Sequence, residues 1–198
     1  MSEILDISPR LGAGLPVWPG DEPYRFHWTG RIAEGARCNA GALSLSTHAG
    51  AHADAPLHVL AEGRDVGSVG LEPYWGPARV FDLSTSTEIG RERIAALDWV
   101  GVRRALFRTG TPGAHLTEDA AAFLVEQRVL LVGIDSLSVD VEDHPDMPVH
   151  KIFAHAGVAI LECLRLENVQ AGDYELAALP LAIEGGDASP VRAALRRK

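Results

Sequence analysis

Three histidines and one aspartate, all side chains that can ligate a metal, occur within eleven residues of the chain. They are His48, His52, Asp54 and His58, in the segment HAGAHADAPLH. Imidazole nitrogen combined with carboxylate oxygen suits zinc, and also manganese or iron, while the lack of nearby cysteine ligands argues against a closed structural zinc site. Two histidines and one aspartate leave a coordination position for water, whose pKa a bound zinc can lower to about 7. The pattern therefore indicates an open, catalytic metal site.

The spacing of these residues restricts the backbone between them. All four occupy even positions, which point to one side of an extended chain, whereas on a helix Asp54 would lie about 200° around the axis from His52. A straight strand would still hold His48 and His52 about 13 Å apart, at roughly 3.3 Å per residue, too far to share one ion. We therefore expect a bend, for which Gly50 gives the backbone its freedom. The alternative, that these are ordinary core histidines, suits a lone histidine better than a cluster.

A second group of possible ligands lies far along the chain. It comprises His144, His150, His155 and Glu162. Glu162 closes the apolar run 158–161, and a carboxylate at the end of a buried strand needs a cation or several hydrogen bonds to offset its desolvation. We expect a metal there, the alternative being an edge glutamate that reaches solvent. Local sequence alone does not choose the ligand among the three histidines.

The elements that would position these residues alternate between strands and helices. Apolar runs predict strands at 78–83, 105–108, 129–134 and 158–161. Thr117 is the expected N-cap of a helix whose apolar stripe includes Leu124. A further strand is expected over 177–183, broken by Pro180 and therefore bent or at an edge. The first third, rich in glycine and proline, should form loops and short strands. Together these elements predict an α/β fold with a mixed sheet.

The bulk composition excludes several classes of protein. A chain of 198 residues without repeats or linker-like segments fits a single domain over 1–198. A net charge of -9 argues against a nucleic-acid partner. Two cysteines are too few for a disulfide framework, which favours the cytoplasm. The acidic N-terminus is unlike a signal peptide, and no run approaches the roughly 20 apolar residues of a membrane span.

Several motifs along the chain, taken in order, resemble those of one family. The segment HAGAHADAPLH at 48–58 strongly resembles the signature of the bacterial kynurenine formamidases, or arylformamidases, within the cyclase family of metal-dependent hydrolases. Other segments similar to motifs of this family are 6–8, 16–21, 108–111, 133–136, 159–162 and 187–192. The resemblance therefore covers nearly the whole chain. It implies a cyclase-like single domain of the swivelling β/β/α type, and a homodimer.

The resemblance also implies a set of metal ligands. It assigns two zinc ions to each chain, with manganese as the alternative metal. The first ion would be held by His48, His52 and Asp54. Asp54 would bridge to the second ion, held also by His150 and Glu162.

The activity implied by the resemblance is hydrolysis of N-formyl-L-kynurenine to L-kynurenine and formate, in tryptophan degradation. His58 would be the catalytic acid and base, passing a proton to the departing arylamine. Trp18 would line the substrate pocket, where an indole offers a wide face to an aromatic ring. Two departures stand out. Cys163 occupies a position where relatives commonly have glycine, and His155 is an additional histidine without an assigned role.

Two alternatives to this activity remain at the level of sequence. One is a related hydrolase of the same family that opens cyclic amides such as isatin. The other is a metal-storage or metal-sensing module without turnover. A sensor, however, has no need of His58 as an uncoordinated proton shuttle beside an open metal site.

Overall fold

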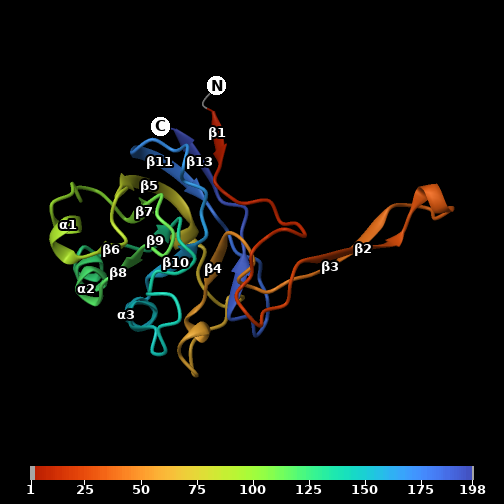
Figure 1. The fold of residues 1–198 in the computed structure, drawn as a ribbon, viewed down its shortest axis with the longest axis horizontal. Helices are drawn as coiled ribbons and strands as arrows, with labels where there is room; N and C mark the ends of the chain where they lie inside the picture. Colours follow the sequence, from red (N-terminus) through yellow and green to blue (C-terminus); the bar gives the residue numbers. More distant parts are fainter. Residues whose placement is uncertain (1–2, 198) are drawn as a thin grey trace.

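A nine-stranded mixed sheet carries the fold in the computed structural model, which describes residues 3–197 (Figure 1). The strand order is β1-β13-β11-β5-β7-β9-β10-β4-β12. The strands are β1 (Ile4–Asp6), β4 (His52–Asp54), β5 (Trp75–Asp82), β7 (Arg104–Arg108), β9 (Leu131–Ile134), β10 (Ala159–Glu162), β11 (Gly172–Ala177), β12 (Ala188–Pro190) and β13 (Ala194–Arg197). Strands β5, β7, β9 and β10 are parallel, and the pairs outside this group are antiparallel. The predicted α/β fold with a mixed sheet is confirmed.

Three helices cover one face of the parallel strands (Figure 1). They are α1 (Arg91–Ala95), α2 (Glu118–Glu126) and α3 (Pro148–Ala156), accompanied by the short pair β6 (Glu88–Ile89) and β8 (His115–Leu116). Because successive strand residues point to opposite faces, Phe107 packs into the core under the helices while Leu106 packs into a second core on the other face. Both side chains are fully buried.

A hairpin arm projects from the body of the molecule (Figure 1). It consists of β2 (Arg25–Gly30) and β3 (Ala40–Ser44), paired with each other and joined through the short 3-10 turn η1 (Ile32–Glu34). Four large apolar side chains of the arm are exposed, namely Phe26, Trp28, Ile32 and Leu43. The rings of Phe26 and Trp28 pack edge to face, with centroids 5.0 Å apart.

Most of the predicted elements are present, with two exceptions. The four strand predictions correspond to β5, β7, β9 and β10, and the Thr117 side chain accepts a hydrogen bond from the Ala120 N–H as an N-cap should. The strand expected over 177–183 was wrong, because β11 ends at Ala177. Beyond it Pro180 has no N–H to donate, and Leu181 donates to the Ser189 hydroxyl instead of a strand ladder. Helix α3 was not predicted. Over residues 3–197, no helix is both long enough and apolar enough to cross a membrane.

Candidate metal centre

The segment 48–58 brings its ligands together through a bend at Gly50. This residue has φ of 67°, in the left-handed region that favours glycine. After the bend, His52 and Asp54 point from one face of β4 toward the cluster while Ala53 packs into the core behind them. The predicted bend and shared face are therefore present. At the end of the segment, the 3-10 turn η2 (Pro56–His58) carries His58 back toward the cluster.

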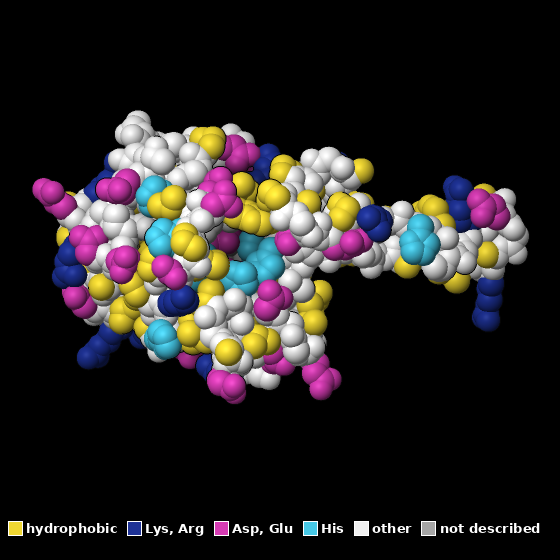
Figure 2. All heavy atoms as spheres, turned by 60° about the horizontal axis from the view of Figure 1, so that its bottom comes forward, with side chains coloured by type: hydrophobic (Ala, Val, Ile, Leu, Met, Phe, Trp, Pro, Cys, Tyr) yellow, Lys and Arg dark blue, Asp and Glu magenta, His cyan; other side chains and the backbone are white. Residues whose placement is uncertain are grey.

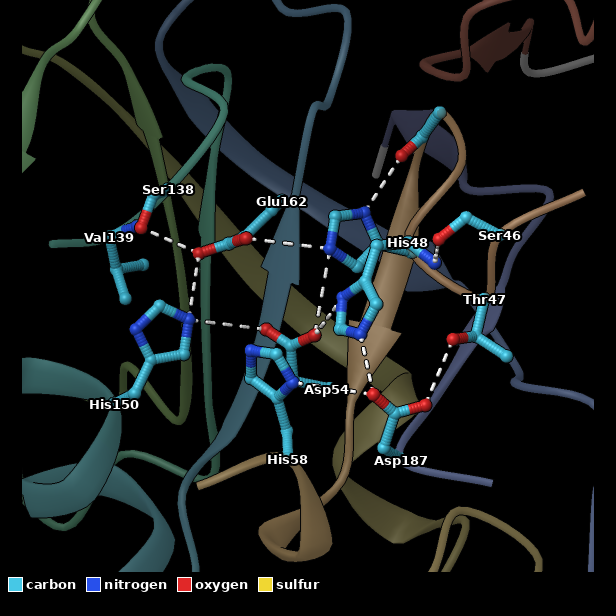
Figure 3. A network of polar contacts seen from close by, with 12 residues as sticks. Ser46, Thr47, His48, Asp54, His58, Ser138, Val139, His150, Glu162 and Asp187 are labelled. Atoms are coloured by element: carbon cyan, nitrogen blue, oxygen red, sulfur yellow. Dashed lines mark hydrogen bonds and ion pairs between the residues drawn. The ribbon is translucent and has the colours of Figure 1, made fainter. Parts of the chain in front are cut away.

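Asp54 lies at the centre of the cluster (Figure 3). Its Oδ1 atom is 3.2 Å from His48 Nδ1 and 3.5 Å from His52 Nε2, whereas its Oδ2 atom is 3.5 Å from His150 Nε2. The register of β10 against β4 places Glu162 opposite His52. The two Glu162 oxygens therefore lie 3.4 Å from His52 Nε2 and 3.2 Å from His150 Nε2. Five residues from three separate parts of the chain meet here.

In each of His48, His52 and His150, one ring nitrogen forms a hydrogen bond with an acceptor outside the cluster. His52 Nδ1 donates to the Gly50 carbonyl at 2.8 Å, because a carbonyl oxygen can only accept. His150 Nδ1 donates to Asp140 at 2.6 Å, and His48 Nε2 donates to Asp187 at 2.9 Å. When these rings are neutral, the other nitrogen of each ring carries a lone pair that faces the carboxylates. Such outer partners fix the orientation of histidines that bind metals.

Several buried polar atoms in the cluster lack a protein partner. Within residues 3–197, His52 Nε2 and both carboxylate oxygens of Asp54 have no hydrogen-bond partner. Lone pairs that face carboxylates in a buried site repel one another unless a cation lies between them. Two ligand sets are close enough to hold one, namely His48 with His52 and Asp54, and Asp54 with His150 and Glu162. The donor set fits two metal ions that share Asp54.

The electrostatics of the cluster also favour positive charge. Burial opposes the charged form of His52, but the negative charge of Asp54 and the contacts with Glu162 outweigh it and raise the pKa of His52 well above its ordinary value. Burial likewise opposes the charge of Asp54, yet the neighbouring histidines lower the pKa of its carboxyl well below the usual range. The pKa of His150 is raised well above its ordinary value against the effect of burial, mainly by Glu162. Each shift reflects a site that attracts cations.

His58 differs from the other histidines of the site. Burial, opposed by the charge of Asp54, lowers the pKa of His58, so its ring is neutral at pH 7. Its Nδ1 atom is 3.4 Å from Oδ2 of Asp187. Burial opposes the charge of Asp187, but hydrogen bonds from His48 and Thr47 lower the pKa of this carboxyl to about 2. His58, His48 and Asp187 are also close enough together to form a third possible ligand set.

Two residues of the site, Asp140 and Asp187, were not singled out from the sequence. Asp140 accepts hydrogen bonds from the backbone N–H groups of Val149 and His150, at 2.9 and 3.0 Å, where α3 begins. Its role follows only from this fold. Asp187 is the first residue of the segment 187–192, which resembles a motif of the family. A carboxylate in that motif could have identified Asp187 as a candidate site residue.

A cavity of about 480 Å³ lies in front of the cluster. Figure 2 shows this hollow with histidine side chains at its floor. Trp18 belongs to its wall and is 40% exposed, as expected for a residue at the rim. Cys163 also lines it and has φ of 57°, a conformation that glycine adopts more readily. The second group contains two histidines besides His150. His144 lines this cavity, whereas His155 is exposed on α3 and does not line it.

The chain is similar to several known proteins over most or all of its length. The family model described as "Putative cyclase" matches residues 5–141. A kynurenine formamidase from Geobacillus thermodenitrificans is 42% identical, over 100% of this chain and 99% of its own. One from Salinibacter ruber is 42% identical, over 98% and 97%. A "predicted metal-dependent hydrolase" from Bacillus stearothermophilus has a similar structure, with a TM-score of 0.83, 29% identity and full coverage of both chains. Isatin hydrolase A from Ralstonia solanacearum shares the fold, with a TM-score of 0.83, 23% identity and coverage of 99% and 92%.

Proposed function

The chain belongs to the cyclase family of metal-dependent hydrolases, and we propose that it is an arylformamidase that hydrolyses N-formyl-L-kynurenine to L-kynurenine and formate. The observation that carries the proposal is the position of the neutral His58 beside two ligand sets that share Asp54. A second support is that the chain is 42% identical over its whole length to a kynurenine formamidase. The reaction adds the OH of water to the formyl carbon and breaks its bond to the arylamine nitrogen.

We infer that the cofactor is a pair of divalent ions, zinc or manganese. His48, His52 and Asp54 would hold one, and Asp54, His150 and Glu162 the other. When bound, such ions supply Lewis acidity, which lowers the pKa of a water molecule and stabilises negative charge on the formyl oxygen.

The front cavity has the size and lining that the substrate requires. Its volume of about 480 Å³ lies within the range of small-molecule sites. The exposed face of Trp18 at the rim suits the aryl ring of the substrate, since an aromatic pair adds to the energy of burial. With the ring at the rim, the formyl group would point toward the histidines that line the hollow (Figure 2). Trp18 therefore orients the substrate.

His58 moves the proton that the reaction requires. Because burial lowers the pKa of His58, the ring is neutral and accepts a proton as the water attacks. The neighbouring carboxylate of Asp187 stabilises the resulting positive charge on the imidazolium. His58 then passes the proton to the arylamine nitrogen as the C–N bond breaks, and the amine leaves as a neutral group. Asp187 is a positioning residue for His58.

The two alternatives from the sequence receive less support. Isatin hydrolases share the fold at 23% identity, whereas relatives at 42% identity carry the name kynurenine formamidase. A metal sensor without turnover would not need a neutral histidine next to the ligand sets. The arylformamidase activity is therefore better supported than either alternative.

We further infer that two copies of the chain form a homodimer in the cytoplasm. The hairpin arm supports the dimer, because Phe26, Trp28, Ile32 and Leu43 are exposed on it. An isolated two-stranded hairpin has marginal stability in water, so apolar contacts with a second copy would stabilise it. The proposed cytoplasmic location is supported by the two cysteines, Cys38 and Cys163, which are both free.

A direct test compares N-formyl-L-kynurenine with isatin as substrates of the zinc-loaded and chelator-treated protein. We expect the loaded protein to release formate from the first substrate with a much larger kcat/KM than it shows on isatin. The chelated protein should be inactive, and zinc should restore it. A larger kcat/KM on isatin would reassign the activity within the family, and no turnover of either amide would contradict the proposal.

A further inference from the structure

A second cavity, which we call the rear cavity, also borders the cluster, and its lining does not include Trp18. Its volume is about 290 Å³. Asp54, His58 and His150 form part of its wall, and of these His58 and His150 also line the front cavity. Neither the 16–21 segment nor the 137–147 segment, both of which contribute to the front cavity, reaches the rear one. The two cavities therefore share two histidines in their walls, next to the place where the formyl bond would break.

The rear cavity reaches solvent at a separate place on the surface. Arg64, Gly70, Glu72 and Gly157 all belong to its lining and are all exposed. Deeper in, the wall is mainly apolar and includes Leu130, Val158 and Ile160. The lining of the cavity thus combines exposed polar residues at the surface with Asp54, His58 and His150 of the cluster.

The polar groups along this cavity suit a small anion. Arg64 is the only arginine or lysine in the lining within residues 3–197, and the one carboxylate near the mouth, Glu72, is exposed to water. Tyr74 is buried in the wall. Burial, with the negative charge of Asp54, raises the pKa of Tyr74 to about 12, so the hydroxyl keeps its proton at neutral pH. An arginine and a phenol can both donate hydrogen bonds to a carboxylate.

The two products of the proposed reaction differ greatly in size. Kynurenine retains the aryl ring and the amino-acid group, and it would still fill the front cavity after the bond breaks. Formate, with one carbon and two oxygens, forms at the wall between the cavities. We propose that the rear cavity binds formate between Tyr74 and Arg64 and releases it to solvent independently of kynurenine. This inference rests on the proposed arylformamidase activity.

The test measures formate binding while the front cavity is filled. Carbon-13 formate is titrated into the zinc-loaded protein with and without saturating L-kynurenine, and its binding and exchange are followed by NMR line broadening. We expect formate to bind with similar affinity in both cases. Displacement of formate by kynurenine would mean that both products use the front cavity, and would overturn the proposal.

Two variants separate the rear cavity from the rest of the molecule. Arg64→Met keeps the aliphatic stem and removes the charge, so formate should bind several-fold more weakly while the affinity for kynurenine stays the same. Arg128→Met is the matched control, because Arg128 is exposed and lines neither cavity. Gly70→Phe narrows the mouth, since a Cβ added at Gly70 meets no atom within 4 Å. It should slow the exchange of formate.

The outcomes distinguish this inference from the activity on which it rests. Hydrolysis of N-formyl-L-kynurenine is first measured on the same zinc-loaded sample. Suppose that the wild type is active, and that Arg64→Met and Gly70→Phe bind and exchange formate in the same way as the wild type. The proposed formate site in the rear cavity is then wrong, whereas the proposed activity is unaffected. If the wild type does not hydrolyse the substrate, the proposed function itself fails. Should Arg64→Met not fold, Gly70→Phe decides alone.

Discussion

Asp187 links His58 to His48 through a single carboxylate oxygen. Its Oδ2 atom is 3.4 Å from His58 Nδ1 and 2.9 Å from His48 Nε2 (Figure 3). The remaining oxygen accepts a hydrogen bond from the Thr47 hydroxyl at 2.9 Å. One carboxylate therefore orients both a proposed metal ligand and the proposed acid and base.

Asp187→Asn tests this link. We expect kcat to fall roughly 10–100-fold, the usual effect of losing an outer partner of a metal-binding histidine, with KM little changed. Steady-state kinetics and elemental analysis on the same preparation measure both effects. Thr47→Val is the matched control. It removes only the hydroxyl contact to Asp187, so kcat should fall less than in Asp187→Asn. Equal kcat values for wild type and Asp187→Asn would show that the carboxylate does not position these histidines.

His58→Ala should separate metal binding from chemistry. We expect the metal content to stay near that of the wild type while kcat falls roughly 10²–10⁴-fold, the usual loss for a general acid and base. Because His58 also belongs to a third possible ligand set with His48 and Asp187, elemental analysis is the decisive measurement. A variant that loses one metal would identify His58 as a ligand.

The pH dependence of kcat/KM should report the protonation of His58. Burial lowers the pKa of this ring from its ordinary value of 6.5, and the base must be neutral to accept a proton. Activity should therefore be retained at pH 7 and fall only below pH 6.5. Asp187 acts to raise this pKa, so Asp187→Asn should move the acidic limb to still lower pH. An acidic limb centred above pH 6.5 in the wild type would argue against His58 as the base.

Asp54→Asn should impair metal binding more than a change at any other single residue. Its two oxygens face different ligand sets, and an amide offers only one oxygen and no charge. Elemental analysis after dialysis gives the metal content per chain. Full occupancy by two ions in the variant would show that Asp54 is not a bridge.

Trp18→Ala should raise KM for N-formyl-L-kynurenine several-fold or more at unchanged metal content. The variant loses both the buried area of the indole and the stacking contribution of about 0.5–1.5 kcal/mol. A small aliphatic formamide gains nothing from the ring and serves as the internal control. Equal losses for the two substrates would mean that Trp18 supports the fold and does not contact the arene.

The ligands that lie close together in the sequence were the easiest to predict. In the segment 48–58, residue types and even spacing were enough to place four side chains near one another and to require a bend at Gly50. Strand and helix periodicity likewise identified β5, β7, β9, β10 and α2. These are local properties, which the sequence carries without knowledge of the fold.

The remaining parts of the site depend on long-range pairing. Asp187 is 129 residues from His58 along the chain, and no local pattern predicts their contact. Asp140 becomes a partner of His150 only because α3 begins beside it, and this helix was not predicted. The choice of His150 over His144 and His155 came from family resemblance. The hairpin arm was expected only as part of the loops and short strands of the first third, and its strands β2 and β3 pair only with each other.

The pairing of β4 with β12 determines when the site can assemble during synthesis. Residues 48–54 are made early, but their neighbours β12 and Asp187 emerge from the ribosome only after most of the chain. Contacts of such large sequence separation form slowly, because the loop between them must close first. Until its last segments arrive, the nascent chain therefore carries His48 without its partner Asp187 and β4 with the edge that pairs with β12 exposed.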